Sequence, residues 1–274
     1  MKTAVVFDSA GTLIKVYRIA RDVDDGRLME NVVSTNMVIN GPGCALVSLR
    51  VEDASLVDST NGDLLLTDFI RQNGIGLDVV CRGHECTIDN VISAAMQDRT
   101  ACVRDIKEAV AAVKLKCKDI YYVNIGLVVD VLHSSIPYVL ATGGKLFPGV
   151  KTLVRNLMND DVGIYIASGD NKKSLLALAE ELDMPVENVY AAVSPSGKRD
   201  VVKTLKQRYE TVIMVGDGIN DRQAFQAADL GVLTLQQEGV RPGILYDSAD
   251  IIIEDISQVE RIIKENLHMI KSKN

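Results

Sequence analysis

Acidic side chains stand directly after two apolar, strand-like runs of the sequence. Asp8 follows the run TAVVF, and Asp217 follows TVIMVG, with Asp221 four residues later in the segment GDGIND. Oxygen ligands of this kind suit Mg²⁺, which favours carboxylates, carbonyl groups and water. A carboxylate can also attack phosphorus and form an aspartyl-phosphate, which splits one difficult step into two easier ones. The three aspartates therefore indicate phosphoryl transfer at a metal site.

Two other segments hold groups suited to the oxygens of a phosphoryl group. Ser168 and Gly169 follow the apolar run VGIYIA and open a helical pattern, whose first backbone amides attract anions. Lys198 lies near the start of an amphipathic pattern after SPSG and brings a positive point charge. Thr12 belongs to the turn that follows Asp8. We expect Ser168 and Lys198 to take part in catalysis. We expect Thr12 and Gly169 to contact the substrate.

These groups need a scaffold that brings them together, and residues 1–14 and 146–274 provide one. Short apolar runs alternate there with helical patterns. The runs predict strands at 3–7, 162–167, 211–216, 229–233 and 250–254, and the patterns predict helices at 172–182 and 197–209. Such alternation is typical of an α/β fold, here a Rossmann-like parallel sheet covered by helices on both faces. Ligands of open α/β sheets bind beyond the carboxyl ends of the strands, where all the polar groups above are expected.

Residues 15–145 have a different pattern of predicted strands and helices and are expected to form an inserted α+β cap or substrate domain. Strands are predicted near 15–20, 32–39 and 44–51, and helices near 64–73, 87–97 and 103–117, with a hairpin at 119–142. The turn-rich segment GGKLFPGV marks the return to the catalytic core, which comprises residues 1–14 and 146–274.

The composition argues against several classes of partner. The formal net charge is −7, there is no Trp and there are four Phe, so neither nucleic acid nor an anionic membrane surface is an expected partner. The most apolar window, residues 120–144, is interrupted by Asp130, His133 and Pro137. It favours two strands over a membrane-spanning helix.

The cysteines indicate a reducing compartment. Five cysteines, an odd number, occur without a secretory signal, so we expect free thiols and a cytoplasmic protein. The stretch CRGHEC brings Cys81, His84 and Cys86 close in sequence, but no fourth ligand lies nearby. We interpret it as a strand end and a loop rather than a metal site.

Taken together, the segments DSAGT, ASGDN, PSGKRDVV and GDGIND resemble, in order, the four motifs of the haloacid dehalogenase superfamily. Ser168 follows Asp8 by 160 positions, and this long gap resembles a cap inserted after the first motif. Within that superfamily, FPGVKTLVRNL and MVGDGINDRQAFQAADLGV are most similar to the phosphorylation domain of P-type ATPases, with Ser168 where those pumps usually have Thr. The resemblance implies a soluble phosphohydrolase of P-type ATPase type.

The resemblance also implies roles for individual residues. Asp8 would be the nucleophile, and Mg²⁺ would be held by Asp8, Asp217 and the backbone carbonyl of Ala10. Asp221 would complete the metal site by orienting a metal-bound water.

The phosphoryl group has its own set of residues in the superfamily. By the same resemblance, Ser168 and Asn220 would hold the phosphoryl oxygens and Lys198 would neutralise their charge. The substrate implied is a small phosphorylated molecule, with a nucleotide as one candidate. No nucleotide-binding signature is recognised in residues 15–145.

Ala10 departs from the superfamily pattern. Most phosphatases of the superfamily have a second Asp two residues after the nucleophile, which protonates the leaving group and then activates water. General acid–base catalysis is typically worth ~10²–10⁴-fold, so ordinary monoesters are expected to be poor substrates. Activated phosphates, such as ATP-like anhydrides and acyl or aryl phosphates, need no proton at the leaving group and are expected to be favoured.

Two alternatives stay open from the sequence. Phosphonoacetaldehyde hydrolases also have Ala at this position and cleave a C–P bond through a cap lysine, but no lysine lies between Lys15 and Lys107 here. A sensing module would bind phosphate or a nucleotide without turnover, and the intact Asp8, Lys198 and Asp217 argue against it.

Overall fold

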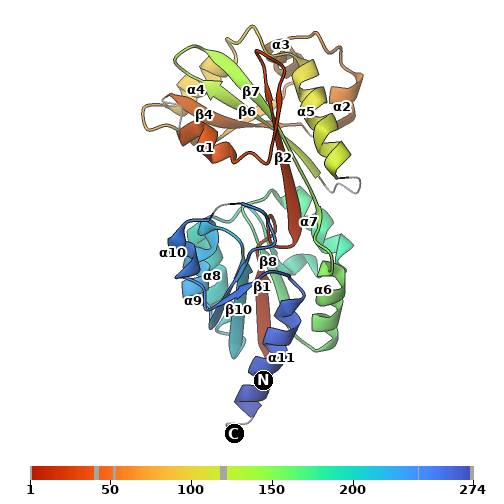
Figure 1. Ribbon diagram of the computed structural model, residues 1–274, viewed down its shortest axis with the longest axis vertical. Coiled ribbons are helices and arrows are strands. Elements are labelled where there is room, and N and C mark those ends of the chain that lie inside the picture. Colours follow the sequence, from red (N-terminus) through yellow and green to blue (C-terminus); the bar gives the residue numbers. More distant parts are fainter. Residues whose placement is uncertain (1, 40–42, 52–53, 118–121, 240, 272–274) are drawn as a thin grey trace. The chain divides into compact units, whose positions relative to one another are not determined.

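The computed structural model describes residues 2–39, 43–51, 54–117, 122–239 and 241–271. The chain divides into two compact units (Figure 1). Residues 1–16 and 145–274 form the first, called here the core unit, and residues 17–144 form the second, called the insert unit. Two strands, β2 (Ile14–Asp22) and β7 (Ser135–Leu146), carry the chain out of the core unit and back into it.

The core unit is built on a six-stranded parallel sheet of order β12-β11-β10-β1-β8-β9. Its strands are β1 (Thr3–Phe7), β8 (Gly163–Ala167), β9 (Val189–Tyr190), β10 (Thr211–Gly216), β11 (Leu230–Thr234) and β12 (Ile251–Ile253). Strand β1 is central and buried along its whole length, as an apolar run in a sheet covered on both faces requires. The predicted parallel α/β core is confirmed. Among these six strands, only the two-residue β9 was not predicted.

Helices cover both faces of this sheet (Figure 1). They are α6 (Val150–Asn159), α7 (Lys172–Glu181), α8 (Pro195–Leu205), α9 (Arg222–Ala227), α10 (Gly243–Tyr246) and α11 (Gln258–Lys271), with 3₁₀ turns η1 (Val186–Asn188) and η2 (Ile219–Asp221). On one face, Val202 of α8, Phe225 of α9 and Leu245 of α10 pack in one apolar cluster with Val6 and Met214 of the sheet. This burial, rather than helix propensity alone, fixes where the short helices lie.

The starts of α7 and α8 are set by side-chain caps. The Asn171 side chain accepts a hydrogen bond from Ser174 N (2.9 Å), and the Ser194 hydroxyl accepts one from Gly197 N (3.1 Å). Pro195 at the first position of α8 suits a helix start because its missing N–H would have no partner there. Both helices therefore begin beside the polar residues that precede them.

The insert unit is a second six-stranded sheet, of order β3-β2-β7-β6-β4-β5, whose described pairings are antiparallel. Its further strands are β3 (Leu28–Glu30), β4 (Cys44–Arg50), β5 (Gly76–Arg82) and β6 (Tyr122–Asp130). Its helices are α1 (Ser34–Ile39), α2 (Ala54–Ser59), α3 (Leu66–Gln72), α4 (Ile88–Ala95) and α5 (Val103–Lys116). The main apolar cluster joins Phe69, Val91 and Ile106 of the helices to Leu127 and Val139 of the sheet.

Several elements of the insert unit differ from those predicted from the sequence. The strand predicted at 32–39 is wrong, because Ser34–Ile39 forms α1. Ser34 and Val38 are both buried one helical turn apart, and Val38 packs on Leu46 and Val128, so a helical face covers the sheet here. The expected hairpin is the pair β6–β7, although residues 119–121 lie outside the described residues. Helix α2 and strand β3 were not predicted.

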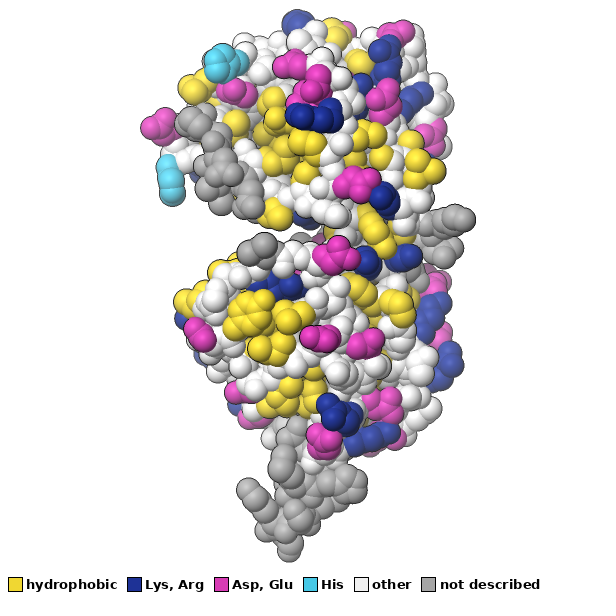
Figure 2. All heavy atoms as spheres, viewed as in Figure 1, with side chains coloured by type: hydrophobic (Ala, Val, Ile, Leu, Met, Phe, Trp, Pro, Cys, Tyr) yellow, Lys and Arg dark blue, Asp and Glu magenta, His cyan; other side chains and the backbone are white. Residues whose placement is uncertain are grey.

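Charged side chains of both signs are interspersed over the face of each unit shown in Figure 2. No helix among the described residues is long and apolar enough to cross a bilayer.

The buried Asp98 side chain connects two segments of the insert unit through hydrogen bonds to their backbone amides. It is 1% exposed, its Oδ1 accepts from Thr100 N and Ala101 N, and its Oδ2 accepts from Ile136 N (3.0 Å). Asp98→Ala should lower the free energy of unfolding by about 2–3 kcal/mol, because these buried donors lose a charged acceptor. Urea unfolding followed by circular dichroism measures the change. The exposed Asp24→Ala is the control, and an equal effect in both variants would contradict this account.

Candidate active site

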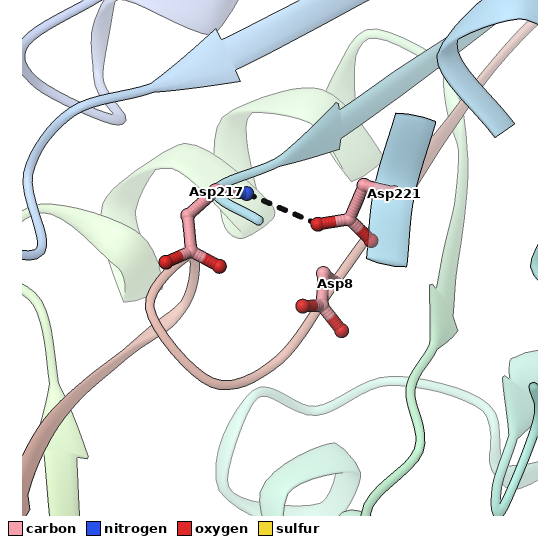
Figure 3. Close-up of side chains that lie close together, drawn as sticks. All are labelled: Asp8, Asp217 and Asp221. Carbon is pink, nitrogen blue, oxygen red and sulfur yellow. Dashed lines mark hydrogen bonds between the residues drawn. The ribbon is translucent and has the colours of Figure 1, made fainter. Parts of the chain in front are cut away.

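Three carboxylates converge at the carboxyl ends of β1 and β10. Pairing of Phe7 with Val215 sets the two strand ends side by side, so Asp8 and Asp217 emerge together. Asp221 joins them from η2, and one oxygen of each side chain lies within 4.8 Å of the others (Figure 3). Within the described part of the chain, this is the only group of three or more acidic, His or Cys side chains that could hold one metal ion.

Lys198 lies between two of these carboxylates. Its side chain is 1% exposed, and Nζ is 2.7 Å from Oδ1 of Asp8 and 2.7 Å from Oδ1 of Asp221. Burial lowers the pKa of Lys198, but the two neighbouring carboxylates outweigh burial and raise the pKa above its usual value. The lysine is therefore a fixed positive charge, and without it two buried carboxylates would have no counter-ion.

Asp221 is fixed from its other side by backbone amides. Its Oδ2 accepts hydrogen bonds from Asp217 N (3.2 Å) and Gly218 N (3.1 Å), the first of which is drawn in Figure 3. A Cβ on Gly216 would lie 2.4 Å from this oxygen, so only glycine leaves room for the carboxylate. Burial and the Asp8 charge raise the pKa of Asp221, while Lys198 opposes them.

Asp217 is the least compensated of the three. Burial, followed by the charges of Asp8 and Asp221, raises its pKa to about 8, although Arg241 acts in the opposite direction. The backbone of Gly11, at φ +80°, lies close to the Asp217 carboxylate. A side chain at this position would collide with it, because a Cβ would lie 2.1 Å from Asp217 Oδ2.

This donor set fits a divalent cation. Three carboxylates crowd together, and Asp8 Oδ1, although buried and ion-paired with Lys198, makes no hydrogen bond within the described residues. An excess of buried negative charge and an oxygen-only set of donors are what Mg²⁺ requires. Ala10, whose carbonyl the sequence predicts as a further ligand, lies in the turn two residues beyond Asp8.

Ser168 lies at the same edge of the sheet, because β8 is the other neighbour of β1. The Ser168 hydroxyl is buried, donates to Asp170 Oδ2 (3.1 Å) and accepts from Asp170 N (3.3 Å). Gly169 between them is exposed. Burial, followed by the charge of Asp8, raises the pKa of Asp170. Sequence analysis did not assign Asp170, although it stands inside the motif ASGDN.

Thr12 and Asn220 differ in their placement. Thr12 is fully buried in the turn after Asp8, and its hydroxyl has no partner within the described residues. Asn220 lies in η2 beside Asp221, but its side chain is exposed. Their contact with substrate stays a prediction for both.

Arg241 was missed entirely by sequence analysis. Its Nε donates to the backbone oxygen of Asp217 (2.9 Å), from a loop more than twenty residues further along the chain. An arginine outside any motif carries no sequence signal of such a contact.

Comparison with known proteins decides the family. A family model described as a haloacid dehalogenase-like hydrolase matches residues 2–229. The chain belongs to this family of hydrolases. The resemblance found in the four motifs is therefore confirmed, and the chain is that of an enzyme.

The relatives found by sequence are also consistent with the sequence analysis. A soluble P-type ATPase-like phosphatase of Methanocaldococcus jannaschii is 32% identical over 269 residues, which cover 97% of this chain and 94% of that protein. A copper-transporting ATPase of Arabidopsis thaliana is 37% identical over 101 residues, which are 37% of this chain and 10% of that protein. The solved catalytic CPx-ATPase domain CopB-B matches 97% of this chain and 90% of its own, at 16% identity and a TM-score of 0.43. The predicted relationship to P-type ATPases is confirmed by these sequence matches.

The raised pKa of Asp217 has a consequence for stability. In the folded, metal-free protein this carboxyl holds its proton up to about pH 8, whereas an unfolded Asp releases it near pH 4. The folded state therefore binds more protons over this range, and the free energy of unfolding should fall as the pH rises from about 4 to about 8. Asp217→Asn should flatten this slope by up to about 1.4 kcal/mol per pH unit.

Urea unfolding in EDTA at several pH values measures the slope. The exposed Asp161→Asn, in the same unit, should leave the slope as in the wild type. Equal slopes in wild type and Asp217→Asn would show that burial of this carboxyl does not favour its protonated form.

Proposed function

We propose that this protein is a Mg²⁺-dependent phosphohydrolase that forms an aspartyl-phosphate at Asp8 and favours activated phosphates. The observation that carries the proposal is the buried Lys198, 2.7 Å from both Asp8 and Asp221, beside a third carboxylate at the same sheet edge. A structural role alone does not call for three carboxylates and one lysine in such a small volume, because burying charges costs free energy.

The reaction has two steps. In the first, a carboxylate oxygen of Asp8 attacks phosphorus, and the leaving group departs with the electron pair of its bond to phosphorus. In the second, water attacks the phosphorus of the aspartyl-phosphate, releases inorganic phosphate and regenerates Asp8. The backbone of Asp8 is held by a hydrogen bond from its N to Val215 O (2.9 Å), so the nucleophile is presented by the rigid centre of the sheet.

The charge of the transferred group needs compensation at each step. Lys198 supplies it as a fixed cation beside Asp8. The hydroxyls of Ser168 and Thr12, and the amides at the start of α7, would donate to the phosphoryl oxygens, and Ser168 would exchange its hydrogen bond to Asp170 for one to the substrate. Bound Mg²⁺, held by Asp8, Asp217, Asp221 and the carbonyl of Ala10, would neutralise further negative charge on those oxygens.

Substrate choice follows from the alanine beside the nucleophile. Ala10 has no proton to give a leaving group and cannot activate water, so leaving groups that depart as stable anions are favoured. ATP, acyl phosphates and aryl phosphates meet this condition, and the relative from Methanocaldococcus jannaschii, a soluble P-type ATPase-like phosphatase, fits the same class. We assign substrate selection to the insert unit. We assign the cytoplasm as the compartment, in keeping with the odd number of five cysteines.

The substrate preference has a direct test. Wild type should hydrolyse acetyl phosphate and p-nitrophenyl phosphate well and sugar monophosphates poorly. Ala10→Asp should raise turnover of the sugar monophosphates, towards the ~10²–10⁴-fold that general acid–base catalysis typically supplies. Turnover of acetyl phosphate should change far less, because its leaving group needs no proton. Steady-state release of inorganic phosphate measures both rates.

The matched control is Ala10→Asn, which adds nearly the same volume without an acid and should raise neither rate. If Ala10→Asp leaves monoester turnover unchanged while its Mg²⁺ binding equals that of wild type, the missing acid does not set the preference.

A further inference from the structure

Arg241 lies in the loop that follows β11 and gathers three backbone carbonyls. Its side chain is 9% exposed. Nε donates to Asp217 O (2.9 Å), Nη2 to Gln237 O (2.7 Å) and Nη1 to Gly239 O (3.4 Å). The same Nη2 is 3.8 Å from the carboxylate of Asp217. All three nitrogens of the guanidinium therefore donate to its own loop or to one residue of the acidic cluster, through three of its five N–H groups.

Asp217 is consequently held on both sides of its Cα. Its N donates to the Asp221 carboxylate (3.2 Å), and its carbonyl accepts from Arg241 (2.9 Å). A backbone fixed at both peptide groups has little freedom to rotate, so the direction in which the carboxylate points is also fixed. Asp217 itself leaves the sheet into a glycine-containing turn, which would not impose this direction alone.

Gln237, whose carbonyl accepts from Arg241, also forms hydrogen bonds to the strand that leaves the core unit. Its side-chain Oε1 accepts from Val16 N (2.8 Å), and its Nε2 donates to Val16 O (3.1 Å). The amide thus pairs with the backbone of Val16 as a neighbouring strand would. Val16 is the last residue of the core unit before the chain enters the insert unit. The carbonyl of Gln237 is in turn one of the acceptors of Arg241.

The loop is also attached to the sheet at its start. Leu235 N donates to Ile253 O (2.8 Å), and the Gln236 side chain accepts from Ile256 N (2.7 Å). Leu235 and Gln236 thus anchor the start of the loop to the sheet, while Gln237 contacts Val16 and Arg241 contacts Asp217.

We propose that Arg241 is a positioning residue of the active site, which aims the Asp217 carboxylate at the metal position and, with Gln237, joins Asp217 and Val16 into one rigid assembly. The inference rests on the proposed function in one respect, that Asp217 is a metal ligand. The planar guanidinium of Arg241 is essential for this positioning role. A lysine ammonium on a flexible side chain cannot hold three backbone carbonyls in fixed directions. Arg241 acts through hydrogen bonds as well as through its charge, and a lysine in its place keeps only the charge.

The test compares Arg241→Lys with wild type on the full-length chain. Calorimetric titration with Mg²⁺ should give binding about tenfold or more weaker in the variant, the usual effect of losing a group that orients a metal ligand. Arg261→Lys is the matched control, because Arg261 is exposed on α11 and ion-paired with Glu265 of the same helix, and this variant should bind Mg²⁺ as wild type does. Binding in Arg241→Lys equal to wild type would overturn the positioning role.

Amide hydrogen exchange at Val16 provides a readout that involves neither metal nor activity. Arg241→Lys should speed exchange at Val16, because the loop that carries its acceptor Gln237 loses its brace. Unchanged exchange would refute the link between Asp217 and Val16. If Arg241→Lys does not fold, Gln237→Leu replaces it and should speed exchange at Val16 while weakening Mg²⁺ binding.

The two proposals fail in different ways. Wild-type protein that binds no Mg²⁺ would refute the metal-dependent function, and the exchange measurement would still decide whether Arg241 braces the loop.

Discussion

The active site depends on one buried interaction, the contact of a single lysine with two of three crowded carboxylates. Lys198 is 2.7 Å from both Asp8 and Asp221, at almost no exposure to solvent. The desolvation of such charges is repaid only where geometry is good and the remaining polar atoms find partners. Asp221 accepts from two backbone amides, whereas Asp217 faces the Arg241 guanidinium at 3.8 Å, and burial raises the pKa of both carboxyls, that of Asp217 to about 8. The unbalanced negative charge is what makes the cluster suitable for a divalent cation.

The parallel sheet is the means by which these groups meet. Asp8, Ser168 and Asp217 each follow a strand, and β1 lies between β8 and β10, so three segments far apart in sequence end at one edge. Glycines then allow the backbone to come close to the carboxylates. Gly11 and Gly216 are the two positions where a side chain would collide with Asp217 and Asp221. The site is thus specified as much by absent side chains as by present ones.

The sequence predicts those parts of the molecule that depend on local pattern. Continuous apolar runs identify the core strands, and each run ends in the polar residue that the site uses, so Asp8, Ser168 and Asp217 follow from position alone. What escapes prediction depends on contacts between distant segments. Helix α1 contains residues typical of a strand and is decided by packing of Val38 on the insert sheet. Arg241 stands in no motif, and only the folded chain brings it to the Asp217 carbonyl.

One measurement tests the central claim most directly, that Asp8 is a nucleophile held beside a buried lysine. Wild type and Asp8→Asn are each incubated with Mg²⁺ and labelled ATP or, in parallel, labelled acetyl phosphate, then quenched in acid and assayed for protein-bound label. The account predicts acid-stable label on wild type with at least one donor and none on Asp8→Asn, because the amide cannot attack phosphorus. Equal label on both proteins, or none on wild type with either donor, would contradict it.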